Sequence, residues 1–192
     1  MVERKSRYEK DENALFEKVI KIDRVTKVVK GGKRLGFRAL VIVGDGNGKV
    51  GLATARASEV PSAIKKAIER AKKTMVLVNI INGTVPHEVL GKFGASKVML
   101  KPARIGRGVN AGGPVRILCE AVGLKDVVGK SLGSNSALNM AKAGLVALKS
   151  LKSYSVEARR RGFKFNGVLD RFKINENVKP EVVVITKEQG AN

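Results

Sequence analysis

The pattern of apolar and polar positions predicts a sheet and a helix in the first half of the chain. Apolar residues scattered among polar ones at 19–29 predict a strand that runs into an irregular basic loop at 30–34. The β-prone run 37–43 and the turn residues after it are typical of a hairpin. From Pro61, apolar residues recur at the spacing of one helix face, and 76–81 predict a final strand.

The second half alternates strand and helix patterns. Strands are predicted at 98–100 and 127–132, and each is followed by a helix, at 114–122 and 134–151. A Gly-rich loop at 106–113 leads into the first of these helices. Two βα steps therefore predict an α/β-type unit distinct from the first one.

These elements predict an α+β fold of two domains. The first domain covers residues 15–80 and the second covers 84–155, with a junction at the turn residues between them. Residues 1–14 are expected to be a disordered arm, and 156–192 a basic tail with an extension. The β-prone run at 182–185 belongs to neither predicted sheet.

Charge is the first indication of function. The 192 residues carry a formal charge of +21, divided as +10 in residues 1–80 (19 cations, 9 anions) and +11 in 81–192 (19 cations, 8 anions). Nucleic acid and an anionic membrane surface can both neutralise such an excess. Because the excess belongs to the folded body, nucleic acid is favoured. Without a secretory pattern or an apolar run of about 18 residues, we expect a cytoplasmic protein without a membrane partner.

Few residues offer catalytic or metal chemistry. The lone Cys119 lies in an apolar helical stretch and is expected to be a buried thiol. The single histidine, His87, has no recognisable nucleophile partner and is expected at a surface or interface. We therefore predict no catalytic residues, no metal, no cofactor and no small-molecule substrate.

Two segments resemble nucleotide-binding motifs. Residues 46–51 match G-x-G-x-x-G, but strand-like alternation continues on both sides, which indicates a hairpin turn in which Asp45 caps its own backbone. Residues 132–137, with Ser134 and Asn135, resemble the phosphate loop of the kinases for homoserine, mevalonate and galactose. The chain lacks their length and a carboxylate cluster, and an RNA phosphate can occupy the same helix N-terminus.

The basic segment is the most direct binding signal. Six cations fall within fifteen residues around a glycine pair that permits close approach of a phosphate backbone: Arg24, Lys27, Lys30, Lys33, Arg34 and Arg38, with Gly31 and Gly32. Aromatic residues are only 4% of the chain, so recognition should rest on phosphate, 2′-hydroxyl and shape. The segment 104–108, with Arg116, is a second candidate surface.

Taken in order, these segments resemble the universal ribosomal protein family numbered five of the small subunit, in its bacterial form. The matching stretches are RVTKVVKGG (24–32), VGDGNG (43–48), EVP (59–61), GTVPH (83–87), AGG (111–113) with Arg116, and KSLGS (130–134). The resemblance covers about residues 15–162. The chain departs from the family at 51–56 and at Arg107, where a small residue is common.

The resemblance implies a double-stranded-RNA-binding-like first domain and a second domain that shares its fold with the kinases named above. It implies a non-enzymatic constituent of the small ribosomal subunit that binds 16S-type rRNA, supports assembly and the mRNA entry region, and influences decoding accuracy. Ribosomal proteins four and eight are the implied neighbours, the former at Gly108 and Arg116. The implied rRNA-binding residues are Arg24, Thr26, Lys27, Lys30, Gly31, Gly32, Lys33, Arg34, Arg56, Ser134 and Asn135.

Two other functions remain open from the residues alone. A free-standing double-stranded-RNA-binding module explains the first domain and the charge but gives the second domain no role. A small-molecule kinase explains the Ser134 loop but lacks acidic residues and length.

Overall fold

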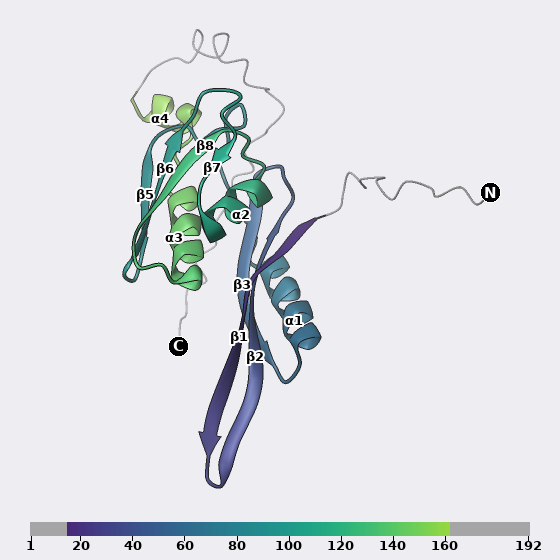
Figure 1. Ribbon diagram of the computed structural model, residues 1–192. Helices are drawn as coiled ribbons and strands as arrows, with labels where there is room; N and C mark the ends of the chain where they lie inside the picture. The colour runs from purple at the N-terminus through teal and green to yellow at the C-terminus, as the bar shows by residue number, and fades with distance from the viewer. Residues whose placement is uncertain (1–14, 162–192) are drawn as a thin grey trace, which may run out of the picture.

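The computed structural model describes residues 15–161, which form two four-stranded sheets with helices packed against them (Figure 1). The predicted arm at 1–14, the extension from residue 162 onward and the run 182–185 lie outside the described residues. The two-domain α+β fold expected from the sequence is confirmed.

The first sheet is antiparallel, in the order β1-β2-β3-β4. Its strands are β1 (Phe16–Val29), β2 (Gly32–Gly44), β3 (Lys49–Ala57) and β4 (Val76–Leu77). The helix α1 (Val60–Lys73) covers one face, with a proline in its first turn. β4 is shorter than the strand predicted at 76–81. Its pairing with the β3 side continues by one further backbone bond, from the Val78 N–H to the carbonyl of Gly48 at 2.8 Å, before the chain leaves the sheet.

Small residues let α1 lie close to its sheet. Ala63, Ala67 and Ala71 are completely buried against the β2 and β3 side chains. A Cβ at Gly51 would lie 2.1 Å from the carbonyl oxygen of Ala71, so the helix backbone touches the strand backbone there. Close packing of this kind offsets the shortage of aromatic side chains in the core.

The strand predicted at 19–29 is confirmed as part of β1, but the irregular loop predicted at 30–34 was wrong, because a tight turn and the start of β2 stand there. β1 and β2 pair without interruption from Asp23↔Arg38 to Val29↔Gly32. Lys30 and Gly31 alone form the turn, and Gly31 has a φ of 85°, the left-handed conformation that tight hairpin turns require. Because β3 pairs with β2 only from Phe37 onward, residues 24–36 project beyond α1 as a two-stranded arm (Figure 1).

The second sheet has the order β5-β6-β8-β7. It consists of β5 (Val89–Phe93), β6 (Ser96–Pro102), β7 (Val109–Asn110) and β8 (Val127–Gly133), with α2 (Gly113–Val122) between the parallel strands β7 and β8. Sequence analysis found β6, α2, β8 and α3 (Ala137–Lys149) but missed β5 and β7. β7 is too short to show periodicity, and β5 has a glycine at its centre, Gly91, where a Cβ would lie 2.2 Å from the Ala143 carbonyl of α3.

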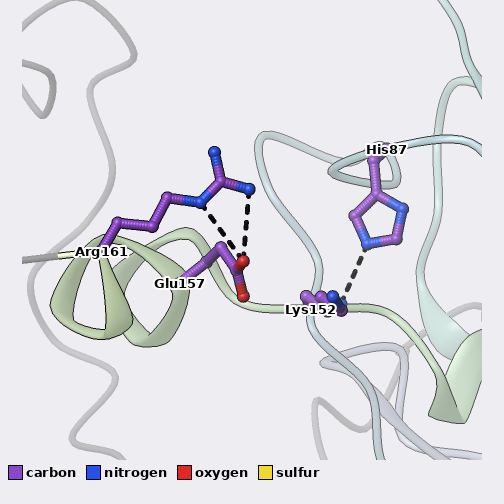
Figure 2. A network of polar contacts seen from close by, with 4 residues as sticks. All are labelled: His87, Lys152, Glu157 and Arg161. Atoms are coloured by element: carbon purple, nitrogen blue, oxygen red, sulfur yellow. Dashed lines mark hydrogen bonds and ion pairs between the residues drawn. The ribbon is translucent and has the colours of Figure 1, made fainter.

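A short helix, α4 (Tyr154–Arg160), follows α3, so the predicted start of the tail at residue 156 falls within it. His87 holds the segment before α4, because its Nε2 accepts the Lys152 backbone N–H at 3.1 Å (Figure 2). Its Nδ1 lies 2.8 Å from the Glu88 carbonyl, so Nδ1 carries the proton. The Tyr154 hydroxyl donates to the Pro86 carbonyl at the same place.

The two sheets meet at α2. The β2–β3 turn docks on the end of this helix, where the backbone N–H groups of Gly46 and Gly48 donate to the carbonyls of Ala121 (3.2 Å) and Val122 (2.9 Å). Carbonyls at a helix C-terminus have no partner within the helix, so the turn satisfies them. Ile42 and Val50 of the first sheet share one core cluster with residues of α2.

The motif at 46–51 therefore has a structural role. The predicted hairpin turn is confirmed, since Asp45 Oδ1 accepts the backbone N–H groups of Asn47 and Lys49, each at 2.8 Å, and α1 begins only at Val60. Gly44 and Gly123 make the close approach possible. A Cβ on Gly44 would lie 2.0 Å from the Ala121 carbonyl oxygen, and one on Gly123 would lie 1.9 Å from that of Gly46.

Cys119 is completely buried in α2, as predicted. Burial raises the pKa of its thiol to about 12, and the neighbouring Glu120 carboxylate adds to this effect. The thiol stays protonated at neutral pH and serves as a core side chain. No helix between residues 15 and 161 has the length and apolar character needed to cross a membrane.

We predict that Gly44→Ala destabilises the protein by about 1–3 kcal/mol, because the new methyl group must displace the Ala121 backbone. Gly32→Ala on the same strand is the control, since a Cβ there meets nothing within 4 Å. Urea unfolding of both variants measures the difference. Equal midpoints for the two variants would show that the contact between β2 and α2 is not tight.

Candidate nucleic-acid interface

The register of the first sheet assigns each cation to a face. Directly paired residues of neighbouring strands point to the same side. Lys27 pairs with Arg34, and Arg38 pairs with both Asp23 and Arg56. These side chains therefore lie on the face opposite α1, since Ala39, next to Arg38, is buried against the helix.

The rest of the predicted cations lie on the other face of the arm or at its tip. Arg24, Thr26 and Lys33 share the α1 side of the sheet, beyond the part that the helix covers. Val28 and Leu35 on this side are 72% and 51% exposed. The arm thus presents basic side chains on both faces, with Lys30 at the turn, and does not form a single flat patch.

Acidic partners are distributed unevenly along the arm. At its base, Asp23 accepts hydrogen bonds from Lys21 (2.8 Å) and Arg38 (3.0 Å), which hold the pKa of that carboxyl below its ordinary value. Toward the tip, Lys27 and Arg34 lie opposite each other, and no carboxylate between residues 15 and 161 is within ion-pair distance of either. Like charges in directly opposite positions destabilise a strand pair.

Gly36 is a site residue that sequence analysis did not identify. A Cβ at this position would lie 3.2 Å from Nε of Arg56, so the guanidinium of Arg56 lies across the bare backbone of Gly36. Arg56 was expected among the RNA-binding residues. The structure brings it to the base of the arm, on the same face as Lys27 and Arg34.

Ser134 and Asn135 belong to a different part of the molecule, between β8 and α3. The Ser134 backbone N–H donates to the Ala95 carbonyl at 3.1 Å, and its carbonyl accepts the Ser96 hydroxyl at 2.7 Å. The Ser134 amide is therefore occupied within the protein. An anion at this loop must be bound by Asn135, which is exposed, or by the first N–H groups of α3.

Gly108 lies in the loop before β7, and Arg116 lies on α2, which follows that strand. The Gly108 N–H donates to Oδ1 of the buried Asp126 at 2.7 Å, and this glycine has a φ of 74°. Arg116 pairs with Glu120 at 2.9 Å and remains largely exposed. Ile105, in the same loop, is 91% exposed. Sequence analysis identified neither Asp126 as the anchor of this loop nor Ile105 as its exposed apolar side chain.

The fold and this surface define a two-domain α+β protein of the RNA-binding class. Within residues 15–161 no three His, Cys, Asp or Glu side chains lie together in a way that could hold a metal ion.

Comparison with protein families agrees with this class. Residues 15–79 match the N-terminal domain of ribosomal protein S5, and residues 91–161 match the C-terminal domain of the same protein. The chain belongs to the ribosomal protein S5 family. This family consists of structural, non-enzymatic proteins of the small ribosomal subunit, and membership implies contact with rRNA and with other ribosomal proteins.

We predict that Arg34→Glu strengthens the arm of the free protein, because it places a carboxylate opposite Lys27. Amide hydrogen exchange at residues 26–35 should slow by up to about fivefold, the equivalent of 1 kcal/mol for a cross-strand ion pair. Arg24→Glu makes the same change in net charge opposite the neutral Phe37 and is the control. Equal exchange rates in the two variants would contradict the pairing of Lys27 with Arg34.

Proposed function

We propose that this chain binds folded 16S-type rRNA through the β1–β2 arm. The proposal rests on Lys27 and Arg34, which lie opposite each other without a carboxylate partner among residues 15–161. Their repulsion destabilises the isolated protein, and neighbouring phosphates would stabilise both side chains. A basic arm that projects beyond its helix also reaches the ligand without moving the folded body.

The two faces of the arm suit two segments of RNA. Lys27, Arg34 and Arg56 lie on one face, and Arg24, Thr26 and Lys33 lie on the other. Lys30, Gly31 and Gly32 at the tip allow close approach of a backbone. Residues 24–36 contain no aromatic side chain, and Phe37 at the base of the arm is partly buried, so recognition rests on phosphate, 2′-hydroxyl and shape. Ser134 and Asn135 form a lesser contact in the second domain.

The loop around Gly108 fits a protein neighbour. Its backbone is fixed by Asp126, and it presents the exposed Ile105 between Arg104 and Arg107 in the sequence, while Arg116 is exposed on α2. An exposed apolar side chain flanked by arginines is typical of a contact point between proteins. We propose that this loop contacts ribosomal protein four, and that ribosomal protein eight is another neighbour of the chain. The bulky Arg107 alters the contact relative to relatives with a small residue there.

The division of the chain into domains at 15–80 and 84–155 is part of the same proposal. The docking of the β2–β3 turn on α2 holds the arm and the Gly108 loop in a fixed relation. Such a protein joins rRNA to a protein neighbour during subunit assembly. Through the same contacts we expect it to shape the mRNA entry region and to influence decoding accuracy.

We predict that Lys27→Gln combined with Arg34→Gln weakens binding to protein-free 16S rRNA. Each lost phosphate contact should lower the slope of log affinity against log salt by about 1, so the slope should fall by about 2. Filter binding over a range of salt concentrations measures it. The control, Lys66→Gln with Lys149→Gln, removes two charges from exposed positions on α1 and α3. An unchanged affinity of the arm variant at low and moderate salt would exclude the arm as the binding site.

A further inference from the structure

The sheet of the second domain has one face without a helix in the described part of the chain. α2 and α3 pack on the opposite face, where Val98 and Leu100 of β6 are completely buried. Side chains alternate along a strand, so their neighbours Lys97, Met99 and Lys101 point to the uncovered face. The register adds Lys92 opposite Lys97, and Lys130 opposite Met99.

This open face of β5, β6 and β8 is basic and has few compensating charges. The three strands contain no aspartate or glutamate. Lys101 pairs with Glu88 at 3.3 Å, but Lys92, Lys97 and Lys130 have no carboxylate within ion-pair distance among residues 15–161. Lys92 and Lys97 are again like charges in directly opposite positions, the arrangement found for Lys27 and Arg34 in the arm.

The kinds of side chain on the open face discriminate between ligands. Protein interfaces are enriched in Tyr, Trp and Arg and depleted of Lys, whereas Lys binds phosphate well as a point charge. This face has lysines, without Arg or aromatic residues, around the apolar side chains of Leu90, Met99, Val128 and Leu132. Lys97 and Lys101 are four residues apart, roughly 13 Å along the strand. The surface is therefore longer than a single phosphate contact.

We propose that the open face of β5, β6 and β8 is a second RNA-binding surface, which contacts the phosphate backbone of duplex RNA through Lys92, Lys97 and Lys130. This inference takes its class of ligand, RNA, from the proposed function. The surface itself lies in a different domain and consists of different residues. A protein with two separate basic surfaces can join two RNA segments, because the backbone hydrogen bonds at α2 connect the two domains.

The most direct test uses the unmodified full chain. Lysines are acetylated with an amine-reactive reagent, with and without an RNA duplex of about 20 base pairs, long enough for a shape-specific contact. Mass spectrometry then gives the protection of each lysine. We expect Lys92, Lys97 and Lys130 to be protected several-fold more than Lys66 and Lys149, which lie on the outer surfaces of α1 and α3. Equal protection at all five positions would overturn the proposal.

Two variants separate this proposal from the function of the arm. Lys92→Gln with Lys97→Gln should weaken duplex binding roughly tenfold at moderate salt, and Lys66→Gln with Lys149→Gln should weaken it much less. Equal losses would mean that only total charge matters, which overturns the assignment. Normal duplex affinity with lost cosedimentation with the small subunit would identify a protein neighbour instead, and would also overturn it. If the arm variant alone loses affinity, the proposed function stands and this inference fails.

Discussion

The structure depends on one contact between backbones: the β2–β3 turn against the end of α2. Gly44 and Gly123 allow the two chains to approach so closely that neither position accepts a side chain. The backbone N–H groups of Gly46 and Gly48 then bond the last carbonyls of the helix. Because both partners are rigid elements, the contact makes a single body from two small domains, each of which has a limited core of its own. The arm, the Gly108 loop and the open face all keep their relative positions through it.

The charge distribution fits a protein that binds a polyanion. Three times within residues 15–161 two cations occupy directly opposite positions on paired strands: Lys27 with Arg34, Arg38 with Arg56, and Lys92 with Lys97. Only Arg38 of these six has a carboxylate partner in the described part of the chain. At the base of the arm, by contrast, the carboxylate of Asp23 pairs closely with Lys21 and with Arg38, and these pairs lower the pKa of the carboxyl. Asp23 shows how the fold balances cations that contribute to stability. The pairs without a carboxylate are therefore interpreted as binding positions. Their repulsion is a small cost in the free protein and is removed when phosphates are bound.

Sequence patterns predicted the elements with clear periodicity and missed those set by tertiary contacts. α1, the strand around residues 37–43 and the turn at Asp45 followed from local signals and are confirmed. The start of β2 at residues 32–34 was mistaken for part of a loop, because a glycine pair and the two cations after it give none of the alternation that marks a half-buried strand. β5 was missed because Gly91 breaks its β-prone pattern, although that glycine is needed for contact with α3. The basic residues of the site were found from composition, whereas their division between two faces depends on register, which no local pattern gave.

The central claim is that the β1–β2 arm lies against rRNA in the small subunit, and protein–RNA crosslinking tests it most directly. Small subunits are isolated on a sucrose gradient, irradiated, digested and analysed by mass spectrometry for peptides that carry nucleotides. The account predicts that the chain sediments with the small subunit and that crosslinked peptides include residues 24–34. Small subunits that contain the chain but yield rRNA crosslinks only outside this segment would contradict it.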